Sequence, residues 1–127
     1  MIPKFRAYSE QYGMRDVVGL YWFDDHLQVT LDNGVGSPIR SSDKVVKLLR
    51  PTPFVDSNGE LIYEGHILTD AGDDWQDGWI YGAVYYDEYE RDWFVDWRSE
   101  SHINYLACER YKTIAGNIYE NPELLEV

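Results

Sequence analysis

Side chains that could bind a metal ion are scattered along the chain. The three histidines and the single cysteine are His26, His66, His102 and Cys108. None of these residues form a pair with the close spacing of zinc ligands. The acidic segment 70–78 contains four aspartates, but a calcium loop starting at Asp70 would place Gly72 and Tyr81 where it needs an oxygen ligand and a glutamate. We therefore expect no metal and no cofactor, and whether segment 70–78 binds a cation stays open.

Nucleophilic catalysis would need Cys108, or a serine, beside an activating histidine. Cys108 follows Leu106-Ala107, so we expect a buried and unreactive thiol. The 23 acidic residues make chance carboxylate pairs unavoidable, so abundance alone does not indicate a glycosidase. The glycine-containing segment 32–36 lacks the Lys-Ser/Thr of a phosphate-binding loop. The sequence favours a protein that is not an enzyme, with a hydrolase using an unrecognised carboxylate pair as the alternative.

Charge is divided unevenly along the 127 residues, which carry a formal net charge of −12. Residues 1–50 hold seven basic and six acidic side chains, whereas residues 51–127 hold four basic and 17 acidic ones, a balance of −13. A field of that sign repels phosphate backbones, so we expect no nucleic-acid binding by the second part. DNA binding through the basic residues of the first 50 remains an alternative. The acidic surface has two interpretations. It keeps an aromatic-rich domain soluble, or it docks on a basic partner.

Aromatic residues are unusually frequent, with 11 Tyr, 5 Trp and 4 Phe. Many of them lie in the two runs 79–86 and 92–97, which we predict to form a hairpin with Trp93, Val95 and Trp97 on one face and Phe94 on the other. These rings are too numerous for a small core, and exposed Trp and Tyr side chains anchor protein interfaces. The predicted interaction surface consists of Trp79, Tyr81, Tyr86, Tyr89, Trp93 and Trp97.

Short β-prone runs separated by turn residues predict a mainly β fold. We expect strands at 4–8, 17–23, 27–31, 66–69 and 111–119, and a tight Asn58-Gly59 turn between the runs 54–55 and 60–63. Segment 41–50 fits a helix or a strand, and its β-branched pair favours the strand. Segment 99–110 is predicted to be a short helix or a loop. Pro51-Thr52-Pro53 marks a boundary between an N-terminal β or α+β subdomain, residues 1–50, and an acidic, barrel-like part, residues 51–127, within one cooperative unit.

Two segments are more specific than these patterns: 56–68, with the sequence DSNGELIYEGHIL, and 114–125, with the sequence IAGNIYENPELL. With the N-terminal segment 4–8, KFRAY, they resemble the YopX family, small proteins of phages and prophages. The family pattern has Asp where this chain has His66, and Thr-Gly-Leu or similar at 52–54. The resemblance implies a β-rich chain with a small SH3-like barrel in its C-terminal part, self-association, and no catalytic residues.

The motif residues have structural roles in this interpretation. Asn58 and Gly59 form the turn, Gly65 and Gly116 permit tight backbone paths, and Asn121-Pro122 caps a terminal helical turn. We therefore expect a phage or prophage protein that is a non-enzymatic interaction module, forming a homo-oligomer or binding a basic host protein. The N-terminus lacks the apolar core of a signal peptide, and no apolar run approaches the ~20 residues of a membrane span, so we expect it in the bacterial cytoplasm, away from membranes.

Overall fold

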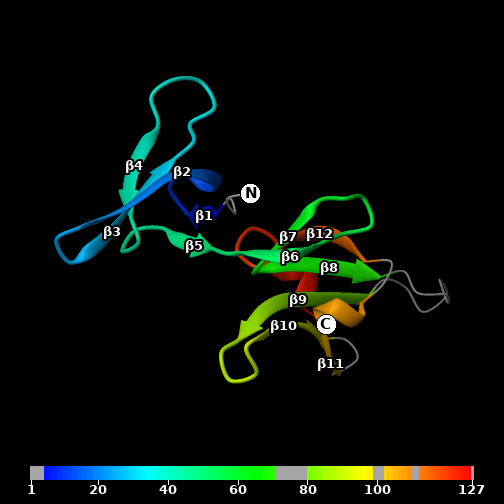
Figure 1. Ribbon diagram of the computed structural model, residues 1–127. Helices are drawn as coiled ribbons and strands as arrows, with labels where there is room; N and C mark the ends of the chain where they lie inside the picture. The colour runs from blue at the N-terminus through cyan, green and yellow to red at the C-terminus, as the bar shows by residue number, and fades with distance from the viewer. Residues whose placement is uncertain (1–4, 71–79, 99–101, 110–111, 127) are drawn as a thin grey trace. The chain divides into compact units, whose positions relative to one another are not determined.

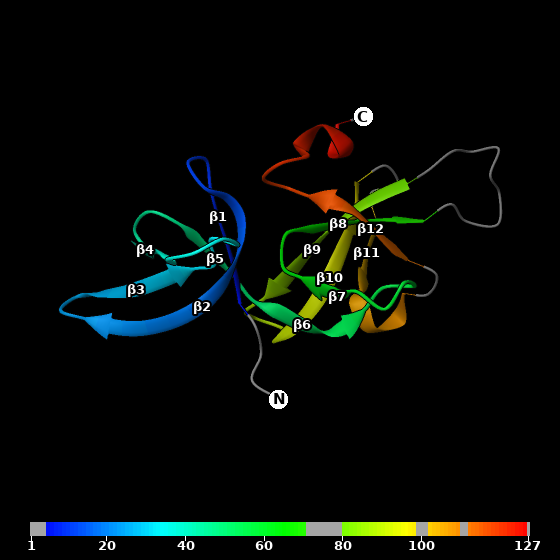
Figure 2. The ribbon, with the colours of Figure 1, turned by 90° about the horizontal axis from the view of Figure 1, so that it is seen from above.

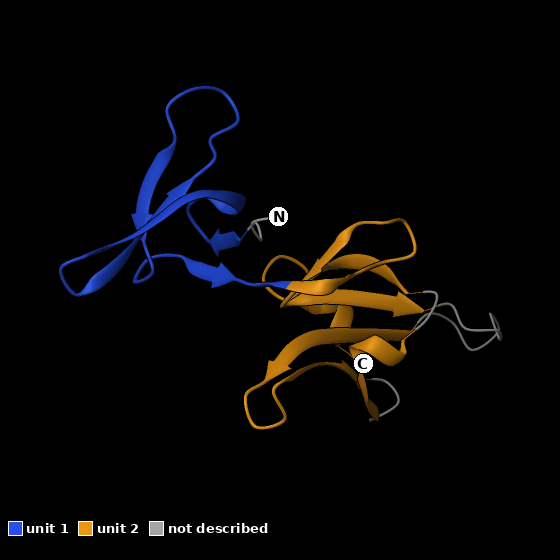
Figure 3. Cartoon of the chain, in the orientation of Figure 1, with its two compact units in different colours: residues 1–51 blue, residues 52–127 orange. Residues whose placement is uncertain are grey.

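The protein is described by a computed structural model that covers residues 5–70, 80–98, 102–109 and 112–126. The chain divides into two compact units, residues 1–51 and 52–127 (Figure 3). Antiparallel strands dominate both units, and the described residues contain 3₁₀ turns but no α-helix, so the mainly β prediction is confirmed. None of the helical turns in the described ranges is long or apolar enough to span a bilayer.

Unit 1 is a five-stranded antiparallel sheet in the order β4-β3-β2-β1-β5 (Figure 1). Its strands are β1 (Arg6–Ser9), β2 (Gly13–Phe23), β3 (His26–Leu31), β4 (Ile39–Ser42) and β5 (Lys47–Leu49). The predicted alternation of Leu27, Val29 and Leu31 is confirmed, since all three pack in one cluster with Ala7 and Val46. Strand β2 is long enough to pair with β1 through its first residues and with β3 through its last.

Segment 41–50 forms strand, turn and strand. Strand β4 ends at Ser42, and the N–H groups of Val45 and Val46 both donate to the Ser42 carbonyl at 3.0 Å. This makes a single turn, after which β5 begins at Lys47. The helix alternative is therefore wrong, and the strand interpretation is confirmed only for residues 41–42 and 47–49, because the β-branched pair Val45-Val46 lies in the turn.

Unit 2 contains a five-stranded antiparallel sheet, order β11-β10-β9-β8-β12, and a two-stranded sheet, β6-β7. The elements are β6 (Pro51–Val55), β7 (Leu61–Tyr63), β8 (His66–Asp70), β9 (Ile80–Asp87), β10 (Asp92–Trp97), β11 (His102–Tyr105), η3 (Leu106–Cys108), β12 (Thr113–Asn117) and η4 (Pro122–Leu125). Within the described residues the larger sheet ends in two edges, β11 and β12, and does not close on itself. Segment 99–110, predicted to be a helix or a loop, supplies the edge strand β11 and the 3₁₀ turn η3.

The β9–β10 hairpin separates its rings by strand alternation, as predicted. Trp93, Val95 and Trp97 face the core, and Phe94 points to the opposite side. Gly82 lies directly opposite Trp97, and a Cβ at Gly82 would come within 2.7 Å of the indole. The absence of a side chain at Gly82 therefore leaves room for the indole over β9. The indole Nε1–H donates to Glu109 at 2.7 Å.

The turn between β6 and β7 is organised by the buried carboxylate of Asp56. Its Oδ1 accepts hydrogen bonds from the N–H groups of Asn58 and Glu60, both at 2.9 Å, and its Oδ2 accepts one from Ile114 on β12 at 3.1 Å. Within this turn only Gly59 has a positive φ, +82°, and its N–H donates to the Asp56 carbonyl. Asn58 therefore does not share the positive φ that the Asn-Gly pair predicted. One carboxylate joins the small sheet to an edge of the large one.

Backbone hydrogen bonds keep the Asp56 carboxylate ionised. Burial by itself raises the pKa of Asp56, but hydrogen bonds from Ile114, Glu60 and Asn58, with the nearby His66, lower it by more, so its net pKa lies below 3.8. His66 is also buried, and its Nδ1 accepts the Tyr63 N–H at 2.9 Å. A carboxylate oxygen at this position could accept the same hydrogen bond.

Strand β12 is followed by η4 near the C-terminus (Figure 2), and side chain to backbone hydrogen bonds hold this C-terminal motif together. Asn117 is buried, and its Oδ1 accepts from the N–H groups of Tyr119 and Glu120 at 3.0 and 2.8 Å. Asn121 precedes η4 but makes no side-chain cap bond; instead its Oδ1 accepts the Asn117 N–H at 3.1 Å. Asn121 therefore occupies the predicted N-cap position without a side-chain capping bond, and Pro122 lies in the first turn of η4 as predicted.

The two motif glycines serve different needs. Gly65 has φ +85°, as a sharp turn between β7 and β8 requires, and a Cβ there would also lie 3.0 Å from the Tyr119 ring. Gly116 does not have positive φ, but a Cβ would collide with the side-chain amide of Asn121. Space, rather than backbone conformation, therefore explains Gly116.

We predict that Asp56→Asn lowers the free energy of unfolding by about 3 kcal/mol at neutral pH, because an amide nitrogen would face a buried backbone N–H. Because the folded pKa lies below 3.8, the contribution of Asp56 is complete above that value and is lost as pH falls through the folded pKa. Urea unfolding at about pH 7 and about pH 3 measures both effects. Glu90→Gln, an exposed change in the β9–β10 turn, is the control. A difference between wild type and Asp56→Asn that does not shrink in acid would contradict this role.

We predict that Gly116→Ala destabilises the protein by about 2 kcal/mol, because the new methyl group displaces the Asn121 amide and breaks its bond to Asn117. Gly19→Ala is the control, since a Cβ there meets Thr30 at an ordinary 3.4 Å. Thermal unfolding of both variants is the measurement. Equal melting temperatures for the two variants would show that space at Gly116 is not limiting.

Candidate interaction surfaces

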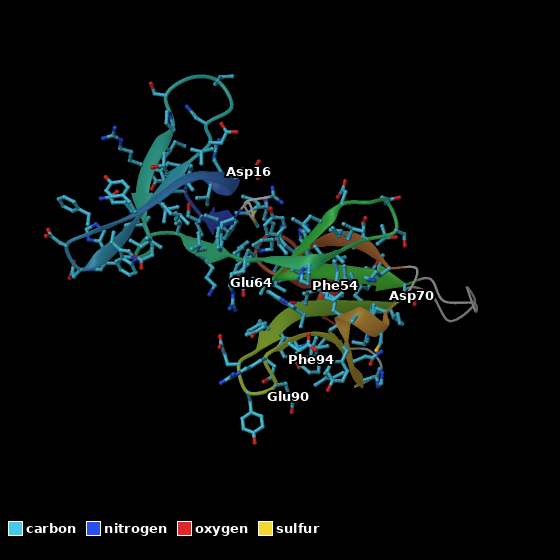
Figure 4. The ribbon with its side chains drawn as sticks, viewed as in Figure 1. Asp16, Phe54, Glu64, Asp70, Glu90 and Phe94 are labelled. Carbon is cyan, nitrogen blue, oxygen red and sulfur yellow. The ribbon has the colours of Figure 1, made fainter. Side chains whose placement is uncertain are left out.

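The outer face of the β9–β10–β11 sheet, the side opposite the tryptophans, carries an aromatic row. Tyr85, Phe94 and Tyr105 are direct cross-strand partners. The Tyr85 and Phe94 rings stack with centroids 5.8 Å apart, and those of Phe94 and Tyr105 are 4.7 Å apart. Phe94 is only 8% exposed between its neighbours, whereas Tyr105 at the sheet edge is 43% exposed. Phe94 on this face and Phe54 on the core side are labelled in Figure 4.

Carboxylates lie on both sides of the aromatic row. On one side of the row, Asp87 of β9 and Asp92 of β10 are cross-strand partners. On the other side, Asp96 of β10 lies between its cross-strand partners Ala83 and Ile103. Burial first, then the charges of Asp87 and Asp96, raise the pKa of the Tyr85 hydroxyl above 10.0. The row is therefore an apolar strip in a negative field. We call it the outer aromatic row.

The predicted interaction residues differ in how far their rings are covered by unit 2. Trp97 is 3% exposed and Trp93 packs against the core cluster, so the burial of their rings is explained within unit 2. Tyr86 packs edge-on against Trp93 with centroids 5.1 Å apart. Tyr81 lies on the same face of strand β9 as Tyr85. Tyr89, in the β9–β10 turn, is 92% exposed. Trp79 and most of the acidic segment 70–78 lie outside the described residues.

A larger group of exposed rings lies in unit 1, at the end of the β2–β3 hairpin. Trp22 is 71% exposed, Tyr21 and Phe23 are each 54% exposed, and Val18 is 60% exposed. The two views in Figures 1 and 2 agree that this hairpin extends past the other strands of unit 1. The sequence contains a visible signal for this surface, because residues 17–23 include no charged residue. The interaction surface predicted from the sequence lies at residues 79–97 and does not include this one.

One edge of this hairpin has no neighbouring strand among the described residues. Strand β1 pairs with β2 from Gly13 to Asp16, and the Phe5 carbonyl accepts the Val17 N–H at 2.9 Å. Strand β3 pairs with the other side of β2 up to Phe23. The segment Val18–Phe23 therefore presents one free side of its backbone as well as exposed apolar side chains. We call it the free β2 edge.

A shallow depression in unit 1 brings His26 near polar side chains. Its lining includes Gln28, Arg40, Ser41 and Ser42. The His26 imidazole contacts Gln28 at 3.3 Å and the exposed Asp25 at 3.4 Å. Among the described residues these contacts of the imidazole are to Asp25 and Gln28 rather than to a serine hydroxyl, so this geometry offers no activated nucleophile. Among the described residues, no three His, Cys, Asp or Glu side chains gather as a metal site would require.

Cys108 is exposed at the end of η3, so the prediction of a buried thiol is wrong. The reason is the short 3₁₀ turn, in which Leu106 points into the core and the two following residues do not. The apolar neighbours that suggested burial are adjacent in sequence only.

These features define a mainly β protein with two five-stranded antiparallel sheets and exposed apolar strips on each. The chain matches the YopX protein family over residues 4–126, and it belongs to that family. The crystal structure of protein yopX from Bacillus subtilis is similar, with a TM-score of 0.61 and 18% identity over 97% of this chain and 98% of that one. At this identity the likeness concerns the fold. Comparison with curated protein sequences finds no match.

We predict that Cys108 reacts stoichiometrically with a thiol reagent such as dithiobis-nitrobenzoate in the native protein, because its side chain is exposed. Absorbance of the released thiolate under native conditions and in denaturant measures the reaction, and Cys108→Ser is the blank. Reaction only after denaturation would contradict the exposed placement.

Proposed function

We propose that the protein is a non-enzymatic protein–protein interaction module that associates with a second copy of itself through the free β2 edge. Its acidic unit 2 would bind a basic protein. The observation that carries the proposal is the exposed, uncharged segment Val18–Phe23, whose outer backbone side has no strand partner among the described residues.

Proteins normally protect a strand edge with lysine, proline or a short length. The segment Val18–Phe23 has none of these protections. An edge of this kind can pair with another strand, and the pairing would satisfy its backbone groups while covering Tyr21, Trp22 and Phe23. Both faces of the hairpin would gain contacts, because neighbouring side chains of a strand point to opposite faces.

A second copy suits this edge because identical edges can pair antiparallel around a two-fold axis. Residues 1–51 carry a net charge of only +1, so two copies of unit 1 would approach without strong repulsion. Residues 52–127 carry −13, which disfavours contacts between two copies of unit 2. The charge distribution therefore favours self-association through unit 1 and a basic partner for unit 2.

The proposal also names the cellular compartment in which the protein acts. The chain would act in the cytoplasm of a bacterium that carries a phage or prophage. What supports this is the family resemblance together with a single cysteine, which leaves the chain without an internal disulfide.

We predict that Trp22→Lys makes the protein monomeric, because a charge on the free β2 edge would be buried in the dimer. Size-exclusion chromatography with light scattering measures the molar mass over a range of concentrations. Wild type should reach at least twice the chain mass of 14.9 kDa, and the variant should stay at that mass.

Val35→Lys is the matched control, because Val35 is an 88% exposed apolar residue of unit 1 outside the hairpin. It makes the same change in charge and should leave the mass of the assembly unchanged. A wild-type protein that is monomeric throughout, or a Trp22→Lys variant that assembles as wild type does, would overturn self-association through this edge.

A further inference from the structure

We propose that the outer aromatic row of unit 2 is a docking site for an arginine side chain from an extended basic segment of a partner protein. The guanidinium would lie against Tyr105, and Asp96 would pair with its charge. This inference rests on the proposal that unit 2 binds a basic protein, and it names the surface and the chemistry of recognition.

The cross-strand register supplies both parts of such a site. The exposed ring of Tyr105 closes the row at the sheet edge, and Asp96 and Ile103 form the next pair along the same face. A cation over an aromatic face gains about 0.5–1 kcal/mol at an exposed site and more when water is excluded. The carboxylate beside the ring adds a charge-assisted hydrogen bond.

A guanidinium of the chain itself already reaches this carboxylate. Arg98, the residue after the end of β10, places its Nε 3.4 Å from the Asp96 Oδ2. The side chains of Arg98 and Asp96 are 58% and 33% exposed. Exposed ion pairs of this kind contribute about 0–1 kcal/mol, so an incoming arginine can replace Arg98 at small cost.

The surrounding charges favour a cation over other occupants. Asp87 and Asp92 are directly opposite each other on the far side of the row, and they add to the negative field over this face. Burial first, and then the charges of Asp87 and Asp96, raise the pKa of the Tyr85 hydroxyl. Phosphate groups would be repelled here.

Arginine fits this face better than lysine does. Its planar guanidinium can stack on a ring and pair with a carboxylate at the same time, whereas the lysine ammonium is a strongly hydrated point charge. The segment that carries it would lie along β11, an edge strand with three exposed residues, His102, Ile103 and Tyr105. Backbone pairing with that edge would position the arginine.

The test is fluorescence anisotropy of a labelled peptide with three arginines spaced by glycines, titrated with the full-length protein. The controls are the same peptide with lysines and the same peptide with glutamates. We expect Asp96→Asn to weaken binding of the arginine peptide about tenfold and Tyr105→Ser about fivefold. Arg98→Gln should strengthen it about threefold, because the internal competitor is removed. Tyr105→Phe keeps the ring and should bind as wild type does.

Two further variants separate the site from the general field. Glu123→Gln removes an exposed negative charge on η4, and Tyr89→Ser removes an exposed ring in the β9–β10 turn; both should bind as wild type does. Thermal unfolding of every variant identifies any that has lost its fold. Equal weakening by Glu123→Gln and Asp96→Asn, or equal binding of the lysine peptide, would overturn the arginine site.

The remaining outcomes distinguish this site from the proposed function. If wild type binds neither basic peptide, unit 2 does not select a basic partner, and both proposals for that unit fail. If Asp96→Asn and Tyr105→Ser leave peptide binding unchanged but lower the molar mass of the assembly, a second copy covers this face and the arginine site is wrong.

Discussion

The antiparallel register of β9, β10 and β11 is the constraint on which the surface of unit 2 depends. It places Tyr85, Phe94 and Tyr105 in one row and sends the tryptophans of β10 to the other face. A shift of one residue would reverse every side chain. Gly82 helps to hold the register, because only a residue without a side chain leaves room for Trp97 at that position.

The family motifs support this sheet through side chain to backbone hydrogen bonds. The Asp56 carboxylate accepts two of them within the β6–β7 turn and one from Ile114 of β12, and Asn117 and Asn121 hold the chain that follows β12. These bonds account for the Asp, Asn and Gly residues of the motif segments. The interaction surfaces that we propose lie on other residues, at the free β2 edge and on the outer aromatic row.

Sequence reasoning predicted the strands, the β6–β7 turn and the two faces of β10, because these depend on alternation and local turn chemistry. It could not predict which rings are covered, because that depends on partners distant in sequence. Tyr105 entered the outer aromatic row only through β11, a strand that the near-helical spacing of segment 99–110 concealed. The burial of Cys108 was wrongly predicted because its apolar neighbours are adjacent in sequence only. Seven consecutive uncharged residues, 17–23, indicate the free β2 edge in the sequence. The prediction instead placed the interaction surface at 79–97, because aromatic residues are more frequent there.

The central claim is that rings at the free β2 edge exist to be covered by another protein, whereas those facing the core of unit 2 are already covered by their own chain. Solvent exchange of the tryptophan indole N–H signals, followed by NMR over a concentration series, tests it most directly. Trp97 should be protected at every concentration, because its N–H is buried and donates to Glu109. Trp22 should exchange freely when dilute and become protected as the concentration rises. A Trp22 signal that exchanges freely at all concentrations would contradict the account.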